Sequence, residues 1–140
     1  MIRSIFVNTS GWLALYNPND PNHTAARQLW EDLRPHPIRL VTTDYVLDQT
    51  FTALKVFGSL HAAQAFNEVV KNSMLIRLFL VDSVIFDRAW NVFIDDEQPH
   101  WTFTDCINYT VIQYLGVSEA FTFDPGFSAP GMATLPSAHE

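Results

Sequence analysis

Apolar residues occur along this chain in two alternating patterns. In the first, short runs of apolar and often β-branched residues are bounded by polar or turn-forming residues, which is typical of buried strands. Such runs predict strands at residues 2–7, 39–42, 75–81, 120–123 and 132–135. In the second, apolar residues recur at helical spacing. This spacing predicts helices at residues 12–16, 22–33, 43–57, 59–72, 83–95 and 105–115.

Because strands and helices alternate throughout, the pattern predicts an α/β fold with a central, mostly parallel sheet covered by helices on both faces. A chain of 140 residues is long enough for one domain with its own core. We therefore expect a single three-layer α/β/α domain over residues 1–140, with a loose tail from about residue 136.

In an open parallel sheet, ligands bind beyond the carboxyl ends of the strands. Three polar residues are predicted there: Asn8 after the first strand, Asp124 after the fourth, and Asp105 at the start of the last helix. Each has a simpler interpretation, since Asn8 and Asp124 are also common turn formers and Asp105 is a favourable helix-start acid. Their combination at one edge of the sheet is more specific than any one of them.

Local signals predict how these residues are held. Residues 9–11 indicate a turn before the first helix. Ser83 and Thr104 are the expected N-caps of the last two helices. Asp105 is then the first residue of its helix, and Asn108 lies one turn further on the same face.

The helix predicted over residues 43–57 carries two apolar faces. The first consists of Val46, Leu47, Thr50, Phe51 and Leu54, and the second of Tyr45, Thr52, Ala53 and Val56. Gln49 falls within the second face, so we interpret it as an inward-pointing amide, either a buried hydrogen-bonded residue or a site residue. Asp48 falls on the remaining polar face and is predicted to be solvated.

The composition is that of a globular protein: 48% of the residues are hydrophobic and 16% are charged, which argues against disorder. No apolar run approaches the roughly 20 residues that span a bilayer, and the first residues lack the pattern of a signal peptide. The single cysteine, Cys106, excludes an internal disulfide and is typical of a reducing compartment, so we expect a cytoplasmic protein.

The charge distribution limits how nucleic acid would be bound. The formal net charge is −7, and no lysine or arginine follows Arg88. A surface that follows phosphates is normally basic, so the C-terminal third does not bind nucleic acid unaided. Two explanations stay open: metal ions offset the carboxylates, or a basic protein partner covers them.

Four segments together resemble one known family. Residues 6–12 read F-V-N-T-S-G-W and are similar to an opening F-V-D-T-S, and residues 46–50 read V-L-D-Q-T, similar to V-L-x-E-T. Residues 101–106 read W-T-F-T-D-C, similar to S-F-T-D-C, and residues 120–127 read A-F-T-F-D-P-G-F, similar to A-x-x-F-D-x-x-F. In this order the segments resemble those of PIN-domain toxins of the VapC family, and they span nearly the whole chain.

The resemblance implies a PIN-like fold and a toxin of a toxin–antitoxin pair that cleaves structured RNA, either transfer RNA or ribosomal RNA. It also implies a homodimer, a cognate antitoxin, and a quartet of acids that binds Mg²⁺ or Mn²⁺. The catalytic positions are Asn8, Gln49, Asp105 and Asp124. Of these, Asn8, Asp105 and Asp124 are the expected metal ligands, and the expected supporting residues are Thr9, Ser10, Asn108 and Asp48.

The sequence departs from the family pattern at two of the four positions, where Asn8 and Gln49 stand in place of acids. An amide oxygen still coordinates a metal but brings no charge. Asp105 and Asp124 alone balance one divalent ion, so we expect weakened metal affinity and low or absent cleavage. Asn8 is either a natural replacement or an introduced inactivating substitution. The alternative function is a non-catalytic PIN-fold protein that binds antitoxin or RNA without cleaving.

Overall fold

A computed structural model describes residues 2–137 of the chain. Its centre is a sheet of five strands in the order β3-β2-β1-β4-β5, and every neighbouring pair is parallel. The strands are β1 (Arg3–Val7), β2 (Ile38–Thr43), β3 (Ile76–Phe79), β4 (Glu119–Phe121) and β5 (Ala133–Leu135). The helices are α1 (Thr9–Tyr16), α2 (His23–Leu33), α3 (Asp44–Phe57), α4 (Leu60–Asn72), α5 (Ser83–Asp95) and α6 (Phe103–Leu115).

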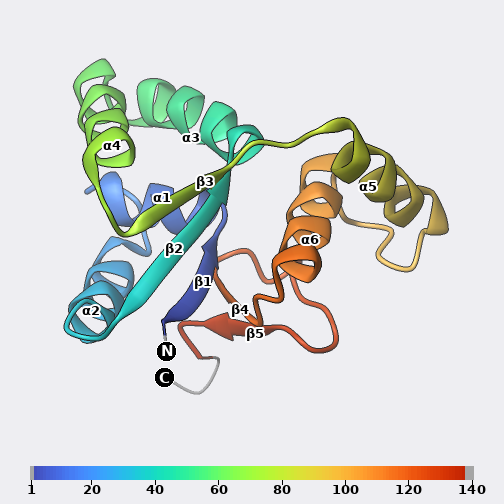
Figure 1. The fold of residues 1–140 in the computed structure, drawn as a ribbon. Coiled ribbons are helices and arrows are strands. Elements are labelled where there is room, and N and C mark those ends of the chain that lie inside the picture. Colours follow the sequence, from blue (N-terminus) through green and yellow to red (C-terminus); the bar gives the residue numbers. More distant parts are fainter. Residues whose placement is uncertain (1, 138–140) are drawn as a thin grey trace.

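The strand order explains how the helices form two outer layers. From β1 the chain adds β2 and β3 on one side, then returns past β1 to add β4 and β5 on the other. Because crossovers between parallel strands are right-handed, this reversal sends the later helices to the opposite face. Figure 1 shows α1 to α4 on one face of the sheet and α5 and α6 on the other. The predicted three-layer α/β/α fold is confirmed.

The reversal of strand order lies between β1 and β4, which pair directly through Phe6 with Ala120 and Val7 with Phe121. Loops that leave two such strands in opposite directions open a crevice at their carboxyl ends. The fold thus places the residues that follow β1 and β4 at one site.

An aromatic cluster joins the helices of the first face to each other. The ring of Phe66 on α4 lies 5.2 Å from Trp12, 5.1 Å from Tyr16 and 5.7 Å from Phe51, measured between centroids. The indole N–H of Trp12 also donates to the hydroxyl of Thr42 on β2, at 3.1 Å. The cluster therefore holds α1, α3 and α4 on one another and on the sheet.

The start of α1 differs from the prediction. Residues 9–11 form its first turn rather than a separate turn, and Asn8 is the N-cap, with its side-chain oxygen accepting from the N–H of Gly11 at 3.2 Å. Gly11 is required by close approach, because a Cβ there would lie 2.5 Å from the carbonyl oxygen of Phe121. The absence of a side chain at Gly11 brings α1 against β4.

The predicted N-caps of α5 and α6 are wrong, by one and by two residues. Asp82 rather than Ser83 caps α5. Thr102 rather than Thr104 caps α6, and its hydroxyl accepts from the N–H of Asp105 while the Asp105 carboxylate accepts from the N–H of Thr102. This reciprocal capping box needs an acid three residues after the cap, and only Thr102 has one at that spacing.

Among residues 2–137, no helix is long and apolar enough to cross a membrane. The prediction of a loose tail from residue 136 falls mainly on residues 138–140, which lie outside the described residues.

We expect Phe66→Ala to lower the free energy of unfolding by about 3–5 kcal/mol, the usual cost of removing a buried ring. Phe66 is fully buried and contacts three other aromatic rings. The control is Phe57→Ala on α3, whose side chain is 73% exposed and should cost less than about 0.5 kcal/mol. Urea unfolding measures both values, and equal losses for the two variants would contradict the assigned core.

Candidate active site

An open cleft of about 450 Å³ lies at the carboxyl ends of β1 and β4. It brings together all four predicted catalytic positions and three of the four predicted supporting residues. The residues that line it are Asn8, Thr9, Ser10, Leu13, Gln49, Thr102, Asp105, Asn108, Phe123, Asp124 and Pro125.

The side chain of Asn8 is buried, and both its oxygen and its nitrogen form hydrogen bonds. Its oxygen accepts from the backbone N–H of Gly11 at 3.2 Å and from the hydroxyl of Ser10 at 2.9 Å. Its nitrogen donates to the hydroxyl of Thr122 at 2.8 Å. Because a backbone N–H can only donate, the Gly11 contact fixes which end of the amide is the oxygen. Asn8 therefore acts as a clamp between α1 and the chain after β4.

The same network positions Asp124. The Thr122 hydroxyl accepts from the N–H of Asp124 at 3.1 Å, and the Ser10 hydroxyl accepts from the N–H of Phe123 at 2.9 Å. One carboxylate oxygen of Asp124 accepts from the N–H of Gly126 at 2.9 Å, which is the turn-forming role that the sequence also allowed. Asp124 is thus both a turn residue and a wall of the cleft.

Gln49 spans the cleft entrance between two helices. Its oxygen accepts from the hydroxyl of Thr9 on α1 at 2.9 Å, and its nitrogen donates to the hydroxyl of Thr104 on α6 at 3.3 Å. The residue is exposed, so the interpretation as a buried amide on a second apolar face is wrong. That second face is itself partly open, since Val56 is 65% exposed. Gln49 points into the cleft rather than into the core.

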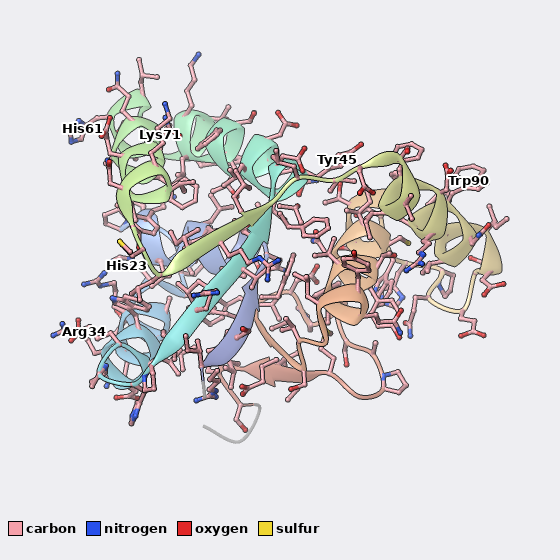
Figure 2. All side chains as sticks on the ribbon, in the orientation of Figure 1. His23, Arg34, Tyr45, His61, Lys71 and Trp90 are labelled. Atoms are coloured by element: carbon pink, nitrogen blue, oxygen red, sulfur yellow. The ribbon has the colours of Figure 1, made fainter. Side chains whose placement is uncertain are left out.

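Asp48 does not line the cleft. It borders an adjoining hollow with Asp44, Tyr45, Gln49 and Thr104. Tyr45, one of the residues that line this hollow, is labelled in Figure 2 near the start of α3. The expectation that Asp48 is a solvated residue is confirmed by its exposure, and of the predicted site residues only Gln49 shares the adjoining hollow with it.

Asp105 lies in the cleft wall, where its surroundings disfavour the ionised carboxylate. Burial raises the pKa of its carboxyl group above the ordinary value, and the nearby charge of Asp124 raises this pKa further. Hydrogen bonds with Thr102 and the charge of His100 act in the opposite direction but do not cancel the rise. Two carboxylates that repel each other across a cleft favour a positive charge between them.

Asn108 lies on α6 one turn after Asp105 and is 2% exposed. Its side-chain oxygen has no hydrogen-bond partner, and it is the only buried side-chain polar atom in residues 2–137 in that state. Buried acceptors are nearly always satisfied in native proteins, so this oxygen is unusual.

A family model for the PIN domain matches residues 5–131. The 23S rRNA-specific endonuclease VapC20 of Mycobacterium tuberculosis, from two strains, is 31% identical over 131 residues, which are 94% of this chain and 97% of that protein. The chain belongs to the VapC family of PIN-domain proteins. A crystal structure of M. tuberculosis VapC20, a sarcin–ricin loop cleaving toxin, superposes with a TM-score of 0.82 at 31% identity, covering 92% of this chain and 96% of the other.

The family and the enzyme class predicted from the motifs, a PIN-domain nuclease, are thereby confirmed. Asn8 and Gln49 are amides at positions where the motif resemblance implies acids. The two amides leave fewer acidic side chains in the cleft. Within residues 2–137, no three histidine, cysteine or acidic side chains are grouped to hold a metal ion. Asp105 and Asp124 are the acids that line the cleft.

His100 is a further residue at this VapC site that the motifs do not indicate. Its Nε2 lies 2.8 Å from the carbonyl oxygen of Gly126, which also accepts from the indole N–H of Trp101 at 2.8 Å. A carbonyl only accepts, so Nε2 donates this hydrogen bond. The 96–102 loop thus holds the turn that carries Asp124. No local sequence signal predicts this contact.

We expect Asp105→Asn to raise the melting temperature in EDTA at neutral pH by a few degrees. The folded-state pKa of Asp105 is raised, so folding favours its protonated form and the ionised carboxylate costs stability above that pKa. The amide removes this cost and still accepts from the Thr102 N–H. Thermal melts from pH 7 down to below the ordinary aspartate pKa should show the advantage shrinking to nothing.

The matched control for this variant is Asp87→Asn, on the exposed part of α5, which should leave the melting temperature unchanged at every pH. A lower melting temperature for Asp105→Asn at neutral pH would show instead that the ionised carboxylate stabilises the fold.

Proposed function

We propose that this VapC-family chain is an endoribonuclease toxin of a toxin–antitoxin pair, acting on structured ribosomal RNA with the help of a single divalent cation. The observation that carries the proposal is the cleft at the reversal of strand order, where Asp105 and Asp124 face each other. The similarity to VapC20, described as 23S rRNA-specific, supports the choice of ribosomal over transfer RNA.

The donor set fits one hard cation. Asp105 uses one carboxylate oxygen for Thr102 and Asp124 uses one for Gly126. Within residues 2–137, no backbone N–H donates to the second oxygen of either carboxylate. Mg²⁺ and Mn²⁺ prefer such oxygens, and two carboxylates balance one such ion. When bound, the ion polarises the scissile phosphate and makes water a better nucleophile.

The protein's own contribution is to hold a phosphate beside these acids. Both α1 and α6 begin at the cleft, and the N-terminus of a helix attracts anions through its dipole and its free N–H groups. This positive potential partly offsets the two carboxylates in a chain of net charge −7. The hydroxyl of Thr9 stands at the start of α1 and donates to Gln49, so it would have to give up that bond to donate to a phosphate oxygen.

The proposed activity is weak, because the two amides remove charge and are already engaged. The oxygen of Asn8 accepts two hydrogen bonds and that of Gln49 accepts one. A role for Asn8 as a ligand requires its oxygen to exchange at least one of these. We propose low cation affinity and slow cleavage for the chain as it stands.

The partner we propose is a cognate antitoxin that covers the cleft with a basic segment. No lysine or arginine follows Arg88, so the cleft side contributed by α6 and the residues after β4 is acidic. Complementary charge steers and orders such a contact. Action on ribosomal RNA together with the free buried thiol of Cys106 supports a cytoplasmic location.

We also propose a homodimer formed through α5. Phe86, Trp90 and Phe93 recur at helical spacing and are 42%, 49% and 41% exposed. Figure 2 shows Trp90 on the outer side of α5, away from the sheet. The rings of Phe86 and Phe93 both pack on Phe103 of α6, at 5.0 and 5.8 Å between centroids. A rigid exposed aromatic stripe of this kind suits a two-fold contact with a second copy.

The alternative is a non-catalytic protein that binds antitoxin or RNA without cleaving. The hydrogen bonds of Asn8 and Gln49 favour it, because they satisfy both amides without any cation.

Restoring the acids should separate the two functions. We expect Asn8→Asp with Gln49→Glu to raise cleavage of a ribosomal RNA hairpin in Mn²⁺ by roughly 10- to 100-fold, the range over which changes around a metal site alter activity. EDTA or Asp124→Asn should abolish it. The control is Asp48→Asn, an acid of the same helix outside the cleft, which should leave the rate unchanged. Gel analysis of labelled RNA measures each rate.

If the restored chain cuts no cellular RNA in Mg²⁺ or Mn²⁺, the nuclease proposal fails. Retained binding to RNA or antitoxin in that case would favour the non-catalytic alternative.

For the dimer, we expect Trp90→Asp to convert the chain from dimer to monomer in light scattering. Val56→Asp, on α3 and 65% exposed, is the matched control and should leave the dimer intact. A native chain that is monomeric at tens of micromolar would contradict this part of the proposal.

A further inference from the structure

The side-chain oxygen of Asn108 lacks a hydrogen-bond partner, which makes it a candidate to contact a ligand. The side chain lines the cleft, is 2% exposed, and yet its oxygen accepts no hydrogen bond within residues 2–137. An acceptor left in this state weakens the fold, because it has lost its water without gaining a donor. A positively charged group in the cleft would satisfy it.

The other two amide oxygens of the cleft, those of Asn8 and Gln49, already accept hydrogen bonds. The oxygen of Asn8 accepts from Ser10 and Gly11, and its nitrogen is held by Thr122. The oxygen of Gln49 accepts from Thr9. Each would have to give up existing bonds to reach a cation, whereas the oxygen of Asn108 has none to lose.

Asn108 lines the same cleft as the two carboxylates. Residues three apart on a helix lie on the same face, with Cβ atoms about 5–6 Å apart. Asn108 therefore stands next to Asp105 on α6, and Asp124 faces Asp105 closely enough for its charge to act on it. Divalent cations of the Mg²⁺ and Ca²⁺ type accept neutral amide oxygens alongside carboxylates.

We propose that Asn108 is a cation ligand of this chain, so that the ion is held by Asp105, Asp124 and Asn108 rather than by Asn8. The inference rests on the proposed function only in requiring that the cleft binds a divalent cation. Two carboxylates supply the charge, and the third oxygen costs no existing hydrogen bond.

The test is titration of the full chain with Mn²⁺ by calorimetry. Asn108→Leu, close in size to the native residue, should weaken Mn²⁺ binding about tenfold or more, and Asn108→Asp should strengthen it about tenfold. The matched control is Thr110→Val, another buried polar residue of α6, whose hydroxyl donates to the carbonyl oxygen of Cys106 at 2.7 Å. Its Mn²⁺ affinity should equal that of the native chain.

Thermal melts in EDTA give a second readout, which separates a ligand role of Asn108 from a purely structural role. Asn108→Leu removes an unsatisfied acceptor, so it should melt at the same temperature as the native chain or higher while binding Mn²⁺ more weakly. A lower melting temperature in EDTA together with unchanged Mn²⁺ affinity would show that Asn108 supports the fold instead.

Asp124→Asn separates failure of this inference from failure of the proposed function. If Asp124→Asn loses Mn²⁺ binding but both Asn108 variants bind like the native chain, the inference is overturned and the cation-dependent nuclease stands. If Asp124→Asn binds Mn²⁺ as the native chain does, the cleft is not the cation site and both proposals fall.

Discussion

The hydrogen bonds of Asn8 hold the cleft in shape. Through one buried side chain they join the first turn of α1 to the chain that follows β4. These bonds are possible only because Gly11 lets α1 come within contact of Phe121. The backbone that carries Asp124 then depends on the same hydroxyl of Thr122 that Asn8 holds. Replacing an acid by an amide at position 8 therefore keeps this junction and removes one charge from it.

The two amides and the two acids of the cleft consequently behave differently. The amides of Asn8 and Gln49 form hydrogen bonds with the protein and do not need an ion as a partner. Asp105 accepts a hydrogen bond from Thr102, yet burial and the charge of Asp124 keep its pKa raised, and the buried oxygen of Asn108 is unpartnered. The two amides therefore need no ion, whereas a cation would stabilise the region around Asp105 and Asn108. This arrangement agrees with the slow cleavage that we propose for this VapC-family chain.

Much of the fold follows from local patterns, because alternating strands and helices with short connections allow few arrangements. The motifs also located the cleft, since strand ends of a parallel sheet meet. What they missed depends on tertiary contacts. Helical phase placed Gln49 on a definite face of α3, but only the positions of α1 and α6 decide that this face borders a cleft. Thr102 and Thr104 are equally good caps until the pairing with Asp105 is considered. His100 reaches Gly126 across 26 residues, and nothing local predicts it.

The number of Mn²⁺ ions bound per chain tests most directly the claim that two carboxylates, and not the amides, define the site. Electron paramagnetic resonance of free Mn²⁺ during titration counts bound ions. The account predicts at most one ion in the native chain, none after Asp124→Asn, and a second ion or much tighter binding after Asn8→Asp with Gln49→Glu. Two tightly bound ions in the native chain would contradict it, because the amides would then serve as ligands despite their hydrogen bonds.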